Sequence, residues 1–78
     1  MITKEQSRAA RGLLDWSQSQ LAGHSNLGES TVRDFEKGRR VPSTNNLAAI
    51  KAALEAAGVV FLEDGVLVDG GAGVRLRK

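Results

Sequence analysis

The chain of 78 residues has no cysteine, one proline and one histidine. Without cysteine, neither a disulfide nor a thiolate metal site can stabilise the fold. Because His24 is the only imidazole and no carboxylate cluster accompanies it, we expect no structural metal and no cofactor. Packed aliphatic side chains must therefore hold together one small domain, whose single core supplies only about 3–5 kcal/mol of net stability.

Long hydrophobic runs and a strong net charge are also missing. No apolar run approaches the roughly 20 residues that a membrane span requires, and the first residues lack a signal-peptide pattern. We therefore expect a cytoplasmic protein without membrane contact. The formal net charge is only +2, but six of the 11 lysines and arginines form two groups, at Lys37, Arg39 and Arg40 and at Arg75, Arg77 and Lys78. A solvated surface is the simpler interpretation of each group, so position in the fold must decide its role.

The residue combinations of an active site are scarce as well. The sequence has no nucleophile–base pair and no metal-ligand cluster. The glycine-rich stretch over residues 70–73 lacks the context of a phosphate-binding loop. We therefore expect no enzymatic activity.

The two N-terminal helices are indicated by their caps. Thr3 and Ser17 each stand three residues before a glutamine, the capping-box pattern that begins a helix. Apolar residues at helical spacing follow, which predicts helices over residues 4–14 and 18–23. Asn26 lies in the polar break after the second helix, and we expect it in a left-handed conformation because its short amide tolerates positive φ.

Two further helices are expected beyond that break. The third begins at Gly28 or Glu29, and Gly38 lies just past its end, where glycine is favoured. The fourth follows Pro42 and ends at Gly58, with apolar residues repeating at intervals of three and four.

After Gly58 the hydrophobic period changes from helical to alternating. Strands are predicted over residues 59–62, 66–68 and 74–77, separated by a turn and a glycine-rich loop. An isolated two-stranded ribbon is marginal in water and leaves its edges unpaired. It must pack on the helices, pair with a second copy, or both, and these alternatives stay open. The candidate residues for a dimer contact are Val59, Phe61, Val74 and Leu76.

The middle of the chain resembles a known family. The motifs are Gln18-x-x-Leu21-Ala22, Leu27, Ser30-Thr31-Val32, Phe35-Glu36-Lys37-Gly38 and Pro42-Ser43. Their types and mutual spacing are similar to the phage repressor/Cro-like helix-turn-helix domains, also called the xenobiotic-response-element family. The resemblance covers roughly residues 3–57. It implies a mainly α, lambda-repressor-like bundle of four helices over residues 1–58, with residues 59–78 as a C-terminal β-ribbon extension.

The resemblance also implies that the third helix enters the major groove of double-stranded DNA. The candidate base-reading residues are Glu29, Ser30, Arg33 and Asp34. Better-known members often carry glutamines or basic residues on this face, so the two carboxylates are a departure. A carboxylate can accept a hydrogen bond from cytosine, although Glu29 fits stabilisation of the helix dipole equally well.

Phosphate contacts and one structural ion pair follow from the same resemblance. The candidates for phosphate contacts are Gln18, Lys37, Arg39, Arg40, Ser43, Thr44 and Asn45. For Ser43 and Thr44, capping of the fourth helix is an equally good explanation. Arg11 and Glu36 match a partly buried salt bridge that positions the third helix. Trp16 matches an apolar position and is expected in the core, and His24 is expected to be exposed.

The implied function is that of a sequence-specific DNA-binding transcriptional regulator, a bacterial or phage repressor. We expect a homodimer on two half-sites, because one module of this size contacts too little DNA for tight binding. The alternative is an antitoxin or adaptor whose ribbon binds a protein partner, such as a toxin, by strand addition.

Overall fold

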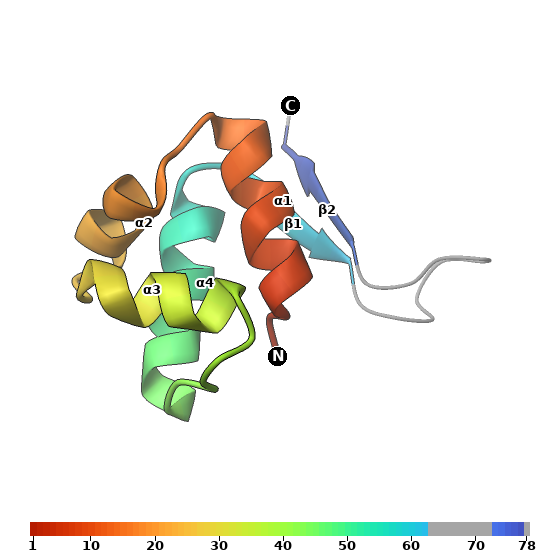
Figure 1. Cartoon of the computed structure of the whole chain (residues 1–78). Coiled ribbons are helices and arrows are strands. Elements are labelled where there is room, and N and C mark those ends of the chain that lie inside the picture. Colours follow the sequence, from red (N-terminus) through yellow and green to blue (C-terminus); the bar gives the residue numbers. More distant parts are fainter. Residues whose placement is uncertain (63–72, 78) are drawn as a thin grey trace.

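The computed structural model describes residues 1–62 and 73–77. They form the helices α1 (Lys4–Leu14), α2 (Gln18–Ser25), α3 (Glu29–Glu36) and α4 (Thr44–Ala56), and the strands β1 (Val59–Leu62) and β2 (Gly73–Leu76). Figure 1 shows α2 and α3 on one side of the molecule and the two strands on the other. The predicted fold, a helical bundle with a short C-terminal ribbon, is confirmed. The strand predicted over residues 66–68 lies outside the described residues.

Both predicted capping boxes are present. The hydroxyls of Thr3 and Ser17 accept the backbone N–H groups of Gln6 and Gln20 at 3.1 and 3.0 Å, and both glutamine side chains return a hydrogen bond. Asn26 has a φ of 59°, as predicted. Because this left-handed residue ends α2, the helix runs two residues past its predicted end at Gly23.

A left-handed turn at Gly38, with φ of 77°, ends α3. The N–H of Gly38 donates to the carbonyl of Phe35 at 3.0 Å, and the N–H of Arg39 donates to that of Asp34 at 2.9 Å. These two bonds form a Schellman motif, which favours glycine because a side chain is strained at positive φ. The turn places Arg39 and Arg40 directly after the last residues of α3.

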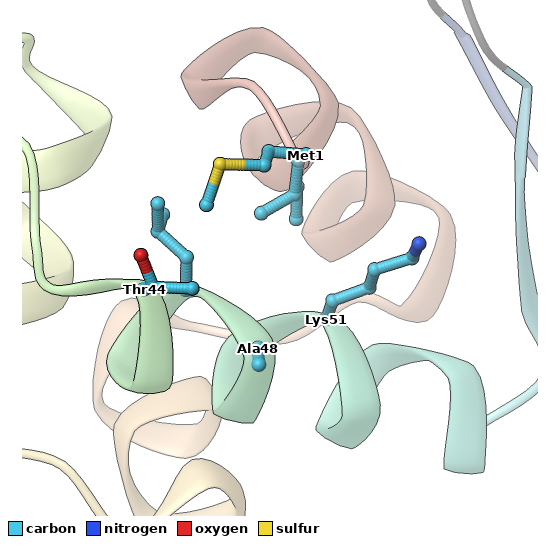
Figure 2. Close-up of a pocket in the computed structure, with 6 residues that line it drawn as sticks. Met1, Thr44, Ala48 and Lys51 are labelled. Atoms are coloured by element: carbon cyan, nitrogen blue, oxygen red, sulfur yellow. The ribbon is translucent and has the colours of Figure 1, made fainter.

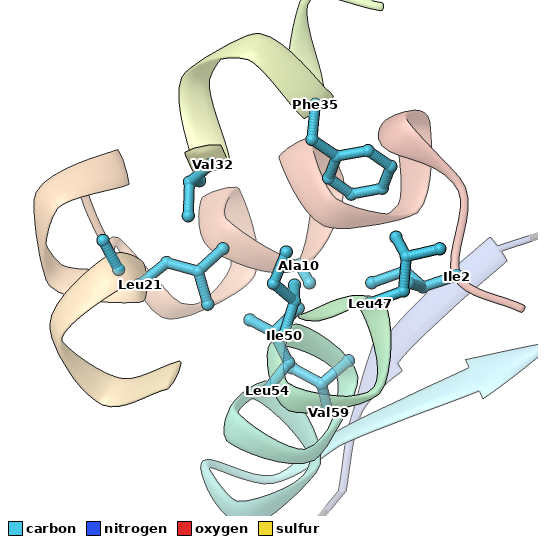
Figure 3. Close-up of a cluster of buried hydrophobic side chains, with 10 residues drawn as sticks. Ile2, Ala10, Leu21, Val32, Phe35, Leu47, Ile50, Leu54 and Val59 are labelled. Atoms are coloured by element: carbon cyan, nitrogen blue, oxygen red, sulfur yellow. The ribbon is translucent and has the colours of Figure 1, made fainter. Parts of the chain in front are cut away.

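The hydrophobic core lies between the four helices and β1. Its side chains point toward one another in Figure 3, and they are Ile2, Ala10, Leu21, Ala22, Val32, Phe35, Leu47, Ile50, Leu54 and Val59. Leu21, Ile50 and Leu54 are fully buried where α2 meets α4. Burial of each such side chain stabilises the fold by about 1.5–3 kcal/mol. The inward faces of α2 and α3 are therefore fixed by packing, which also fixes what their outward faces present.

Trp16 packs against this core from the turn between α1 and α2 and is half-buried. The imidazole of His24 stacks on the indole, with ring centroids 4.3 Å apart and planes within 2°. His24 is exposed as expected. Its stacking on Trp16 was not predicted from the sequence. Trp16 thus belongs to the packing of the fold.

The β-ribbon packs on the chain's own helices. Its strands are antiparallel, with Val59 opposite Leu76 and Phe61 opposite Val74, so all four share one face. Val59 is fully buried in the core, and Phe61 and Val74 are half-buried against it. Val59 is therefore not available for a dimer contact, whereas the assignment of Phe61, Val74 and Leu76 to such a contact stays a prediction. Val59 is buried because α4 leads directly into β1, which turns this face of the ribbon toward the bundle.

Hydrogen bonds from the Gln6 side chain connect α1 to the ribbon. This side chain is 5% exposed, and its amide nitrogen donates to the carbonyls of Leu62 and Gly73, both at 3.1 Å. The side-chain oxygen accepts the N–H of Thr3, so Gln6 both caps α1 and joins the two strands to it.

Candidate nucleic-acid interface

The outward face of α3 is polar and exposed. Val32, Phe35 and Glu36 are buried on the opposite side, and the period of 3.6 residues leaves the other positions toward solvent. The candidate base-reading residues lie together on this face: Glu29, Ser30, Arg33 and Asp34. Asp34 is half-buried, and the other three are exposed. Packing thus leaves these four side chains on the solvent side of α3.

Asp34 and Arg39 face each other at the end of α3. The distance from Asp34 Oδ1 to Arg39 Nη1 is 4.0 Å, and the Arg39 side chain is 66% exposed. Such an exposed ion pair contributes at most about 1 kcal/mol. Either group can therefore leave the pair for another polar partner.

The first turn of α2 supplies backbone donors near this face. The hydroxyl of Ser17 accepts the N–H of Gln20. The N–H groups of Gln18 and Ser19 belong to the first turn, where no helical carbonyl can accept them, and no other acceptor is found for them in the described part of the chain. Free amides and the partial positive charge of a helix N-terminus are suited to a phosphate oxygen.

Glu36 is the centre of a buried network that fixes the end of α3. Its side chain is 1% exposed and forms an ion pair with Arg11, whose Nη2 lies 2.6 Å from Glu36 Oε1. The Arg11 Nε contacts both carboxylate oxygens, at 3.0 and 2.9 Å. The hydroxyl of Ser7 and the amide of Gln18 also donate to this carboxylate, and Arg8 donates to the backbone carbonyl of Glu36. The network joins α1 and the start of α2 to α3.

Two members of this network, Ser7 and Arg8, are not among the predicted site residues. Ser7 lies one helical turn before Arg11 and therefore on the same face of α1, which is the only signal that could have indicated it. Gln18, predicted at the phosphate contact, donates to Glu36 Oε1 at 3.2 Å and so also braces α3.

The network decides the charge of Glu36. Burial would raise the pKa of this carboxyl, but hydrogen bonds from Arg11, Ser7 and Gln18 outweigh burial and lower the pKa below its usual 4.5. A lowered folded-state pKa contributes stability that is fully present above the unfolded-state pKa and is lost as the pH falls through the folded-state pKa.

We therefore expect Glu36→Gln to change the acid limb of the stability profile. The variant is less stable than the wild type at pH 7, because Arg11 loses its ionised partner. The difference between their free energies of unfolding narrows as the pH falls below 4.5, because Glu36 takes up a proton in the unfolded wild-type chain before it does so in the folded protein. Urea denaturation of both proteins, at a series of pH values from 7 down to below 4.5, measures this difference, and the exposed Glu5→Gln is the control. A difference that stays constant across this range would contradict the network's role.

The basic and polar residues after α3 continue the exposed surface. Lys37, Arg39 and Arg40 are all exposed. Ser43 caps α4, because its hydroxyl accepts the N–H of Asn46 at 3.2 Å. The other two candidates in this turn, Thr44 and Asn45, are exposed in the first turn of α4 and not its cap.

A hollow of about 260 Å³ lies between the N-terminal segment and α4 (Figure 2). It is lined by Met1, Ile2, Thr44, Leu47, Ala48 and Lys51, none of which is a carboxylate or an imidazole.

Within residues 1–62 and 73–77, no three His, Cys, Asp or Glu side chains lie close enough to hold a metal ion. No helix in these ranges is both long and apolar enough to cross a bilayer.

A short helix with a polar outward face, braced by a preceding helix across a tight turn, defines a DNA-binding helix-turn-helix domain. The helix-turn-helix family model matches residues 8–57, which contain most of α1 and all of α2, α3 and α4. The chain belongs to this family of Cro- and xenobiotic-response-element-type DNA-binding regulators. A comparison with curated proteins finds no match.

Proposed function

We propose that this protein is a sequence-specific repressor of transcription that inserts α3 into the major groove and acts as a homodimer on two half-sites. The observation that carries the proposal is the exposed polar face of α3, held in place by the Glu36 network. Groups suited to phosphates lie close to the end of this helix, at Gln18, which contacts Glu36, and at Arg39 and Arg40, which follow it. The function is binding, and it requires neither a metal nor a cofactor.

Phosphate contacts would set the orientation of α3 in the groove. The first candidates are the first-turn amides of α2 beside Gln18. The others are Arg39, Arg40 and the exposed first turn of α4. Contacts of this kind fix the register of a protein on the duplex and carry no sequence information themselves. Thr44 and Asn45 would contribute backbone and side-chain donors there, and Lys37 a further positive charge.

Sequence preference would come from the α3 face. Arg33 can donate two hydrogen bonds to a guanine, and Ser30 can bond to any base edge within reach. Carboxylates at Glu29 and Asp34 accept from the amino group of cytosine and repel phosphates, so they penalise misplaced docking. Each well-placed base contact discriminates by about 1–3 kcal/mol.

A homodimer is proposed because one domain covers a single half-site. Two copies with half-sites about 10 base pairs apart would place both α3 helices on the same side of the duplex. Val59 cannot carry the contact between copies, since it lies in the protomer's own core. The alternative function, partner binding by an antitoxin or adaptor, concerns the ribbon and not α3, so one chain can have both functions.

The proposed phosphate contact of Arg39 is tested with Arg39→Ala. We expect the variant to bind all DNA sequences more weakly by a similar factor, and the slope of log affinity against log salt to fall by about 1. Electrophoretic mobility shifts at several salt concentrations measure both quantities. Arg77→Ala, an exposed arginine on the ribbon side, is the matched control and should leave the slope nearly unchanged. A change in sequence preference, with the slope unaltered, would contradict the assignment of Arg39 to a phosphate.

A further inference from the structure

Among the described residues, one edge of the ribbon has no strand paired to it. The described sheet contains only β1 and β2, with Val60 opposite Arg75, and the N–H of Arg77 donates to the carbonyl of Gly58. Hydrogen-bonded pairs alternate along an antiparallel ladder, so the backbone N–H and C=O groups of Val74 and Leu76 point away from β1. Figure 1 shows β2 as the outer strand, on the side of the molecule away from α3. An extended segment can therefore pair with this edge.

The side chains at this edge are both apolar and basic. A shallow groove beside the edge is lined by Leu13, Val60, Val74, Arg75, Leu76 and Arg77. Leu13 and Leu76 are 43% and 38% exposed, so apolar surface borders this edge. Arg75 and Arg77 are exposed and alternate with the apolar residues along the strand. An occupant should thus combine apolar side chains with negative charges at alternating positions.

A second copy of β2 fits this edge poorly. Two β2 strands related by a two-fold axis can form hydrogen bonds only where Val74 or Leu76 of one copy lies opposite Val74 or Leu76 of the other. The two-fold axis must therefore pass beside Val74, Arg75 or Leu76. Centring on Arg75 places it opposite itself, and centring on Leu76 places Arg75 opposite Arg77 twice. Like charges directly opposite each other destabilise a strand pair. Centring on Val74 avoids this contact but pairs only residues 73–75 of the described strand.

We propose that the open edge of β2 is a docking site for an acidic, extended segment of a partner protein, which adds to the sheet as an antiparallel strand. Its carboxylates lie opposite Arg75 and Arg77, and its apolar side chains lie opposite Val74 and Leu76 and reach Leu13. The site is on the far side of the molecule from α3, so a partner can bind there while DNA occupies α3. This function is additional to the proposed DNA binding.

A charge-swap titration of the full chain tests the site. The probes are a blocked peptide that alternates glutamate with valine and a matched peptide with lysine in place of glutamate. We expect the glutamate peptide to bind on the order of tenfold tighter, because two cross-strand ion pairs replace two repulsions. The amide NMR signals of Val74 and Leu76 should shift on binding. The double variant Arg75→Glu/Arg77→Glu should reverse the preference between the peptides.

Leu76→Pro provides a second variant, because it removes an outward N–H without a change of charge. We expect it to abolish binding of the glutamate peptide and to leave DNA affinity unchanged. Equal binding of the two peptides, or shifts confined to the basic residues around α3, would overturn the proposal. A wild-type dimer that Leu76→Pro converts to a monomer in sedimentation would overturn it too, because a second copy would then occupy the edge. Loss of DNA binding alone would count against the proposed function and not against this site.

Discussion

Arg11→Ala is expected to lower the free energy of unfolding by about 3–5 kcal/mol, because it leaves the carboxylate of Glu36 buried without its charged partner. Glu36 is 1% exposed, and Arg11 supplies three of the hydrogen bonds to its carboxylate. A loss of this size is comparable to the whole stability of a small domain. Urea denaturation at pH 7, monitored by circular dichroism, measures the change in the free energy of unfolding.

Two comparisons make this result specific to the ion pair. Arg33→Ala removes the same side chain from an exposed position and should change stability by no more than about 0.5 kcal/mol. Arg11→Met/Glu36→Leu removes both charges and should recover much of the loss, since no buried carboxylate remains unpaired. A loss below about 1 kcal/mol in Arg11→Ala would show that the network does not hold α3.

Val59→Asp is the second variant with a large expected effect. It places an unpaired carboxylate in the core, where the side chain of Val59 is 0% exposed and β1 contacts α4. We expect a loss of about 3 kcal/mol or more, independent of protein concentration, because the burial occurs within one chain. Val41→Asp is the control, since Val41 is 81% exposed and should tolerate the same substitution.

The concentration dependence separates packing from dimerisation. If Val59 lay in a contact between copies, its substitution would destabilise the protein mainly by dissociation, and the loss would vary with protein concentration. Thermal unfolding over a hundredfold range of concentration distinguishes the two cases. A concentration-dependent loss would contradict the packing of the ribbon on its own helices.

The helices could be predicted from the sequence because their signals are local. Thr3, Ser17 and Gly38 mark ends that depend on residues three or four positions away, and all three act there as expected. The end of α2 differs by two residues, since Gly23 tolerates a helix and the left-handed Asn26 ends it.

The long-range contacts could not be predicted in the same way. The alternation of apolar and polar residues along the ribbon indicates which residues share a face. The same alternation is expected whether that face packs on the helices or on a second copy. Gln6 joins carbonyls 56 and 67 residues away, and such a contact has no sequence period. The pair of Arg11 and Glu36 was expected through the family resemblance, whereas Ser7 matches no motif and becomes apparent only where α1 crosses α3.

The most direct test of α3 as the DNA-reading helix is selection of binding sites from random double-stranded DNA by the wild type and by Arg33→Ala. The wild type should enrich one motif in two half-sites about 10 base pairs apart. The variant should lose discrimination at one or two positions of each half-site, equivalent to about 1–3 kcal/mol at those positions, with its fold intact. Enrichment of the same motif with the same affinity by both proteins, or of no motif by either, would contradict the account.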